Sequence, residues 1–126
     1  MISAIRAFVA LALALTIASC STMMSAAPAK MTDGILTNDA GMTLYTFDRD
    51  AAGSGKSVCN GTCATNWPPL MAATDAKPSG PWSIVTRDDG AKQWAYNGKP
   101  LYLWAKDQKP GDKTGDGVQG VWHVAK

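Results

Sequence analysis

The chain has 126 residues and a formal net charge of +2, and this near-neutral balance argues against a nucleic-acid-binding surface. All ten acidic residues are Asp and there is one His, so little general acid–base capacity is available near pH 7, and we expect neither enzyme activity nor a cofactor. Twelve Gly, seven Pro and no Glu disfavour long helices, while five Trp and three Tyr predict an aromatic core.

The N-terminal segment is typical of an export signal. Arg6 supplies a positive charge, and residues 7–18 form an apolar run broken only by Thr16. At ~1.5 Å per residue, this run is too short to cross a hydrocarbon core of ~30 Å. We therefore predict a removed signal peptide over residues 1–19.

Cys20 is the expected lipid-attachment site. It follows Ile17-Ala18-Ser19, which resembles the bacterial lipobox, and Ser21 in the next position favours the outer membrane, facing either the periplasm or the surface. The lipid would then provide an anchor that no segment of the chain supplies. Ordinary cleavage after Ala27, with loss of Cys20, is the alternative. Residues 20–32 are expected to form a flexible tether.

One motif occurs twice, at an offset of 57 positions. Residues 41–50 (the first copy) and 98–107 (the second copy) both read Gly-x-x-Leu-Tyr-x-aromatic-x-x-Asp. Each continues through a Gly-rich stretch to a Trp, which is Trp67 in the first copy and Trp122 in the second. Because two copies are too few for a solenoid or propeller, we predict a single domain over residues 33–126 with a pseudo-twofold relation between its halves.

Short strands and hairpin turns account for both copies. In the first, residues 35–37 and 42–47 flank a turn at residues 38–41. In the second, the β-rich run at residues 82–86 ends at the turn Asp88-Asp89-Gly90, and residues 93–96 lead into Asn97-Gly98, a strong hairpin signal. A closing strand is expected at residues 121–124. The predicted fold class is all-β, a small antiparallel sandwich or barrel-like domain.

The hairpin at Asn97-Gly98 sets which side chains share a face. By strand alternation, one face carries Trp94, Tyr96, Leu101 and Leu103, and the other carries Ala95, Pro100, Tyr102 and Trp104. Both faces are apolar, so we expect one to enter the main core and the other to be covered by loops or a partner.

These residues carry a family resemblance. Tyr45-x-Phe47-x-x-Asp50 and Tyr102-x-Trp104-x-x-Asp107, together with Cys63-Ala-x-x-Trp67-Pro68-Pro69-Leu70, resemble the secreted-repeat family of predicted bacterial lipoproteins. The resemblance covers nearly all of residues 33–125. It implies an envelope location and a two-repeat architecture, and it implies no particular activity.

Cys59 and Cys63 are the clearest chemical feature. A pair of Cys in an exported chain predicts a disulfide, which would pin the Gly-rich loop before Trp67. A redox-active pair is the alternative, although such pairs usually have two intervening residues followed by a helix.

His123 and the Asp residues are the candidate metal ligands. His123 could bind copper with Met42, Met71 or the Cys pair, or it could lie beside Trp122 and bond a backbone carbonyl, which we favour. The Gly-rich run at residues 107–117 could bind calcium, but its Asp residues are better explained as turn caps. The residues concerned are Asp48, Asp50, Asp107, Asp112 and Asp116.

The repeated aromatic residues could form either a core or a surface that stacks on a planar ligand. We predict a core role for Leu44, Leu101, Leu103, Trp94 and Trp104, and less firmly for Tyr45 and Tyr102, whose hydroxyls need partners. The composition and motifs predict a non-catalytic, lipid-anchored envelope module that binds an envelope protein or small ligand, or supports the envelope. A periplasmic redox or metal-handling accessory, using copper or calcium, is the alternative.

Overall fold

The computed structural model describes residues 27–126. The chain is built from short antiparallel strands with one helical turn and one 3-10 turn. In chain order the elements are β1 (Lys30–Thr32), β2 (Ile35–Thr37), β3 (Tyr45–Phe47), α1 (Thr62–Asn66), β4 (Trp82–Thr86), β5 (Lys92–Tyr96), β6 (Lys99–Pro100), η1 (Val118–Gly120) and β7 (Trp122–Val124). The all-β prediction is confirmed.

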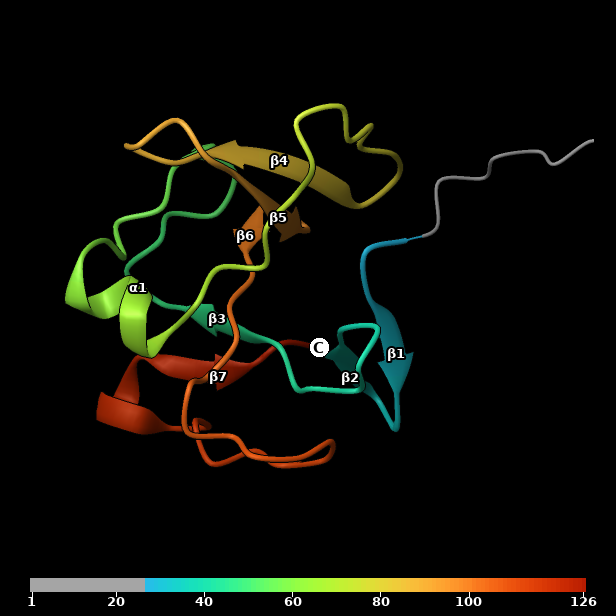
Figure 1. Ribbon diagram of the computed structural model, residues 1–126, viewed down its shortest axis with the longest axis vertical. Helices are drawn as coiled ribbons and strands as arrows, with labels where there is room; N and C mark the ends of the chain where they lie inside the picture. Colours follow the sequence, from blue (N-terminus) through green and yellow to red (C-terminus); the bar gives the residue numbers. More distant parts are fainter. Residues whose placement is uncertain (1–26) are drawn as a thin grey trace, which may run out of the picture.

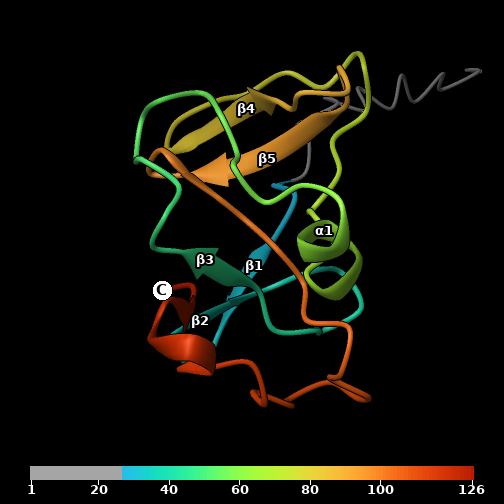
Figure 2. The same cartoon turned by 90° about the vertical axis from the view of Figure 1, so that its left-hand side faces the viewer.

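The strands form three antiparallel groups, which Figure 1 shows as separate ribbons. β1 pairs with β2, β3 pairs with β7, and β4, β5 and β6 form a three-stranded sheet. This sheet lies at one end of the molecule, with β3 below it, as the rotated view in Figure 2 also shows. The sheet grouping therefore does not follow chain order, since β3 and β7 come from distant parts of the sequence.

The hairpin turns form where the sequence supplies residues that accept positive φ. Asn97 and Gly98 have φ of 50° and 80°, and they form the predicted turn between β5 and β6, with Tyr96 opposite Lys99. A Cβ on Gly98 would lie 2.7 Å from the backbone nitrogen of Gly53, so this glycine is also required by close packing. The turn of one copy thus packs against the loop of the other.

The two copies exchange their closing strands. β3 of the first copy pairs with β7, which follows the second copy. Correspondingly, residues 101–103 of the second copy pair with residues 68–70, which follow the first copy. The Leu70 nitrogen donates to the Leu101 oxygen at 2.9 Å, and the Ala125 nitrogen donates to the Leu44 oxygen at 2.8 Å. The same hydrogen bond therefore occurs once in each half, as a duplicated architecture requires.

Adjacent Leu and Tyr of each motif point into different core clusters. Leu44 and Leu101 are fully buried together with Leu36, Ala29 and Ala125. Their neighbours in sequence are buried in an aromatic cluster made of Tyr45, Cys59, Trp67, Tyr102 and Trp122. Because successive strand residues face opposite sides, the Leu-Tyr pair supplies both clusters at once. Leu101 and Tyr102 thus carry the two faces expected from the hairpin into the core, whereas Trp94, Leu103 and Trp104, for which a core role was also predicted, are only half-buried.

The folded part begins earlier than the sequence analysis placed it. β1 lies within residues 20–32, which were predicted to form a tether, and Ala29 is buried in the leucine cluster. β1 pairs with β2 through a turn at Asp33-Gly34, whose φ values are 51° and 83°. The boundary was placed at Asp33 because small and polar residues dominate the preceding stretch, yet pairing to β2 satisfies its backbone groups.

Candidate functional site

The repeated tyrosines meet at the centre of the domain. Tyr45 and Tyr102 occupy the same position in the two copies, and each backbone nitrogen donates to the other residue's carbonyl, at 2.8 and 2.9 Å. Both side chains are fully buried. The pseudo-twofold axis therefore passes between these two residues.

The hydroxyls of the two tyrosines bond across the copies. The Tyr45 hydroxyl donates to Oδ2 of Asp107 at 2.6 Å, and the Tyr102 hydroxyl donates to Oδ2 of Asp50. Each bond joins the strand of one copy to the acidic residue that ends the motif of the other. The motif therefore contains both partners of an interaction that only two copies together can make.

Each carboxylate also holds the loop that follows it. Oδ1 of Asp50 accepts from the Val58 nitrogen at 2.8 Å. Oδ1 of Asp107 accepts from both the nitrogen and the hydroxyl of Thr114, at 3.0 and 2.6 Å. These amide contacts are those expected of a turn cap, and the contact to the opposite tyrosine is one that the sequence analysis missed.

Burial controls the protonation of this centre. Desolvation raises the pKa of the Tyr45 and Tyr102 hydroxyls well above the ordinary value of about 10, and the hydrogen bonds to the two carboxylates raise it further. Desolvation also raises the pKa of Asp50, although bonds from Tyr102 and Val58 oppose this shift. Both phenol hydroxyls are therefore protonated at neutral pH, and each donates a hydrogen bond to its carboxylate.

Four stacked aromatic rings run alongside this centre. Their order is Phe47, Trp122, Trp67 and Trp104, with centroid separations of 4.2, 3.8 and 3.9 Å. The rings alternate between the two copies, and Tyr45 and Tyr102 pack edge-on against Trp67 and Trp122. The two inner rings are buried, so they serve as core, whereas Phe47 and Trp104 are only partly buried.

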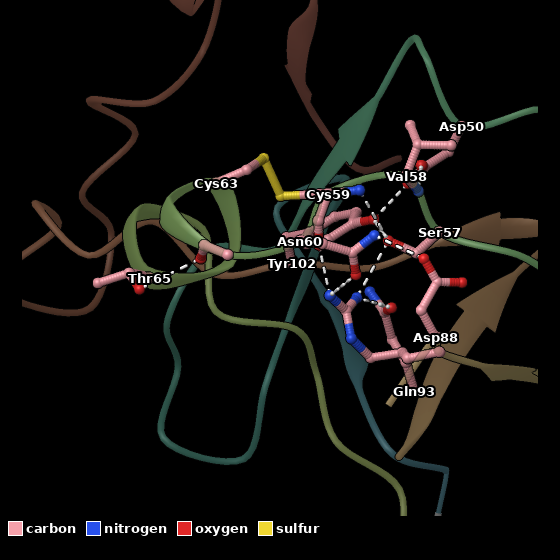
Figure 3. Close-up of a disulfide and its surroundings, with 12 residues drawn as sticks. Asp50, Ser57, Val58, Cys59, Asn60, Cys63, Thr65, Asp88, Gln93 and Tyr102 are labelled. Carbon is pink, nitrogen blue, oxygen red and sulfur yellow. Dashed lines mark hydrogen bonds between the residues drawn. A yellow bond between two sulfur atoms is a disulfide. The ribbon is translucent and has the colours of Figure 1, made fainter. Parts of the chain in front are cut away.

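Cys59 and Cys63 form a disulfide, with a Cα–Cα distance of 5.2 Å. Figure 3 shows it beside the hydrogen-bonded group that contains Ser57, Tyr102 and Asp50. Cys59 is fully buried in the aromatic cluster, and Cys63 is the second residue of α1. The bond thus closes the loop of the first copy just before Trp67.

A buried arginine fixes the same loop. The Arg87 guanidinium donates to the Ser57 hydroxyl at 3.0 Å, to Oε1 of Gln93 at 2.7 Å and to the Cys59 carbonyl. The Ser57 hydroxyl lies 2.5 Å from the Tyr102 hydroxyl, so the arginine is linked to the central tyrosine. The sequence analysis missed Arg87. The one feature of the sequence that could have indicated a role for Arg87 is its position immediately before a turn, in a chain whose cations are mostly lysines.

His123 lies away from the Cys pair, on the exposed side of β7. Its Nε2 is 2.7 Å from Oδ2 of Asp48, so its partner is a carboxylate and not the backbone carbonyl that was expected. Cross-strand pairing of β3 with β7 produces this contact, because it sets Thr46 opposite His123 and Asp48 two residues further on. The two half-exposed side chains form a surface contact, which is an ion pair when His123 is protonated.

The other candidate metal ligands, which were expected to cap turns, accept hydrogen bonds from the backbone. Asp112 accepts from the nitrogens of Gln108 and Lys109, and Asp116 accepts from the Val124 nitrogen. Within residues 27–126, no three His, Cys or Asp side chains gather as they would around a metal ion. In the same part of the chain, no helix has the length and apolar character needed to cross a membrane.

Comparison with known proteins identifies the repeat itself. A family model described as a secreted repeat of unknown function matches twice, over residues 28–71 and residues 83–126. Each match contains one copy of the motif and its following Trp, and together they cover more than half of the chain. No curated protein and no solved structure matches. The chain belongs to this family of secreted repeats.

Proposed function

We propose that this protein is a non-catalytic module of the bacterial cell envelope, anchored by lipid on Cys20, whose folded part binds an envelope partner or small ligand. Cys20 and the export signal lie outside the residues that the structure describes. The single observation that carries the proposal is the crossed bonding of the two Tyr–Asp pairs, because it accounts for the repeated motif without any reaction.

The crossed pairs occupy the polar atoms that would otherwise be candidates for chemistry. The hydroxyls of Tyr45 and Tyr102 are bound to Asp107 and Asp50, and all four side chains are buried. Protonated phenols bound to carboxylates are poor nucleophiles, and the raised pKa values keep them protonated. The motif therefore supports a scaffold, and binding is assigned to the surface residues that differ between the copies.

The location is supported by the sequence and by the family. A short apolar run before Ile17-Ala18-Ser19-Cys20 fits a lipoprotein signal, and the family is described as secreted. A disulfide also suits an oxidising compartment such as the periplasm. Lipid on Cys20 would hold the domain at the outer membrane.

Metabolic labelling with palmitate tests the anchor. The full-length protein should incorporate the label, and Cys20→Ala should abolish incorporation, whereas the matched variant Cys63→Ala should keep it because Cys63 belongs to the folded domain. A mature N-terminus at Pro28 would contradict the proposal, because Cys20 would then be removed with the signal. Capture of envelope proteins by the wild type and not by Cys20→Ala would identify membrane-dependent partners.

A further inference from the structure

The two halves differ in chemistry at equivalent surface positions. A pocket of about 300 Å³ lies between β3, β7 and the turn that joins β5 to β6. Its apolar and aromatic lining residues are Tyr96, Leu101, Val124 and Ala125. Its polar lining residues, which we call the rim, are Thr46, Asp48, Asn97, Lys99, His123 and Lys126. A volume of about 300 Å³ is at the lower end of the range for small-molecule sites.

The charges at this rim favour an anion. Asp48 is the one side-chain carboxylate that lines the pocket, and His123 already engages it at 2.7 Å. Lys99 also lines it, and its ammonium forms no ion pair with a carboxylate of residues 27–126. The rim therefore offers the Lys99 ammonium as unmatched positive charge in the same lining as the Thr46 hydroxyl.

The fold itself does not require these polar residues. Repeated hydrogen bonds fix the equivalence of the halves: the Asp48 nitrogen donates to Val121 at 2.8 Å, and the Ala105 nitrogen donates to Asn66 at 2.9 Å. By this equivalence, Thr46, Asp48, Lys99, His123 and Lys126 correspond to Leu103, Ala105, Met42, Pro68 and Met71. The same backbone is thus built with apolar residues in the other half.

The corresponding hollow in the other half provides an internal comparison. It has a volume of about 380 Å³ and is lined by Leu70, Met71, Trp94, Pro28 and residues 38–40, with no lysine among them. The two hollows share part of their equivalent positions, and Met42, which corresponds to Lys99, does not line the second one. The lysine in the lining of the first is therefore a feature of that site alone. A shared structural need would have produced it twice.

We propose that the pocket between β3, β7 and the β5–β6 turn binds a small organic anion, with its carboxylate or phosphate at Lys99 and Thr46, beside the contact of His123 with Asp48, and its apolar part on Leu101. The inference rests on the proposed binding function and names the chemistry of the ligand. Lys99, the first residue of β6, supplies the charge, and it lines both this pocket and the adjoining hollow beside Phe47.

The single histidine makes the test direct, because His123 gives the only imidazole signals in an NMR spectrum of the full-length protein. Benzoate, phenyl phosphate and the uncharged benzyl alcohol are titrated at constant pH in detergent. At least one anion should shift the His123 signals saturably, and the alcohol should not. Which anion binds more tightly assigns the headgroup as carboxylate or phosphate.

Two lysine variants sharpen the test. Lys99→Met introduces the residue that the other half carries at this position, so the fold should tolerate it, and the anion should bind about tenfold more weakly. The control Lys109→Met removes a lysine from a distant loop and should leave the affinity unchanged. The inference is overturned if neither anion shifts His123, if the alcohol shifts it equally, or if Lys99→Met binds as the wild type does.

The result separates this inference from the envelope proposal. If the protein is labelled with palmitate on Cys20 but binds neither anion, the pocket assignment is wrong and the proposed envelope function is unaffected. A protein that binds an anion at Lys99 but carries no lipid supports the pocket and contradicts the anchor.

Discussion

The loops that follow the motif differ sharply between the two copies, although both begin at an equivalent Asp and end at an equivalent Trp. Seventeen positions separate Asp50 from Trp67, whereas fifteen separate Asp107 from Trp122. The longer loop is held by the disulfide and by Arg87. The shorter one is held by Thr114, whose nitrogen and hydroxyl both bond Asp107.

This difference shows which residues are needed for the fold that both copies share and which stabilise only one copy. The residues common to both copies form the central pairing, the crossed Tyr–Asp bonds and the ring stack. The residues unique to one copy either stiffen its loop or change the chemistry of its surface. Variants made in equivalent pairs can therefore separate shared requirements from local ones.

The largest effect is expected from the paired leucines. Leu44→Ala and Leu101→Ala each remove a fully buried side chain from the leucine cluster, which should lower the free energy of unfolding by about 2–5 kcal/mol. The two losses should be similar because the positions are equivalent. Denaturant unfolding of both variants measures this, and a loss confined to one leucine would break the symmetry of the halves.

The crossed tyrosines should follow. Tyr45→Phe and Tyr102→Phe each remove a donor to a buried carboxylate, at a cost of about 1.5–3 kcal/mol in unfolding free energy. Tyr102→Phe should cost more, because it also removes the contact between the Tyr102 and Ser57 hydroxyls. Tyr96→Phe, on a partly buried strand residue, is the matched control. Equal stabilities for all three variants would show that the crossed bonds contribute nothing.

The disulfide should affect one copy alone. Replacing Cys59 and Cys63 together by Ala should cost ~2 kcal/mol, the chain-entropy value for so short a loop. Amide hydrogen exchange should rise within residues 51–66 and stay unchanged within residues 108–121, which serve as the internal control. Faster exchange in both loops would mean that the disulfide also stabilises the loop of the second copy.

Alkaline pH should reduce the contribution that the two central tyrosines, Tyr45 and Tyr102, make to the free energy of unfolding. Their pKa values are raised in the folded protein, mainly by burial, so the folded state retains protons that the unfolded chain releases above pH ~10. Their contribution to stability is therefore complete below that pH and is lost as the pH rises beyond it. Phenolate absorbance of the folded protein should show two late-ionising tyrosines, and each Tyr→Phe variant should remove one. Normal ionisation of all tyrosines would contradict the buried pairs.

The smallest effect is expected at the surface ion pair. Asp48→Ala introduces the residue found at the equivalent position 105, and both His123 and Asp48 are about half exposed. Exposed ion pairs contribute little, so the unfolding free energy should change by less than about 0.5 kcal/mol. Thermal unfolding checks this, and a large loss would mean that the polar cluster around His123 is needed for folding.

Local features of this fold could be predicted from the sequence. The turn at Asn97-Gly98, the strand at residues 82–86 and the closing strand depend on short-range signals, and the repeat is visible as a pattern. The exchange of closing strands could not be predicted, because side-chain alternation sets the face of a strand and not its partner. β1 was missed for the same reason, since its only support is pairing to β2.

The candidate site was predicted in its parts and not in its connections. Asp50 and Asp107 were expected to cap turns, and the tyrosines were expected to need partners. That each satisfies the other across the copies follows from the central pairing of Tyr45 with Tyr102, which is a tertiary contact. Arg87 was missed because burial of a lone arginine depends on carbonyl and amide groups that only the folded loop presents.

The exchange of closing strands also sets the order in which the chain can fold. β3 finds its partner in residues 122–124, and the Tyr45 hydroxyl finds its acceptor at Asp107. The first copy therefore cannot complete its own structure while the second is still being synthesised or moved across a membrane. Contacts this distant in sequence slow folding, because a long loop must close before they form. A chain released only as far as residue 80 would expose its leucines and aromatic rings, and would be a substrate for proteases and chaperones.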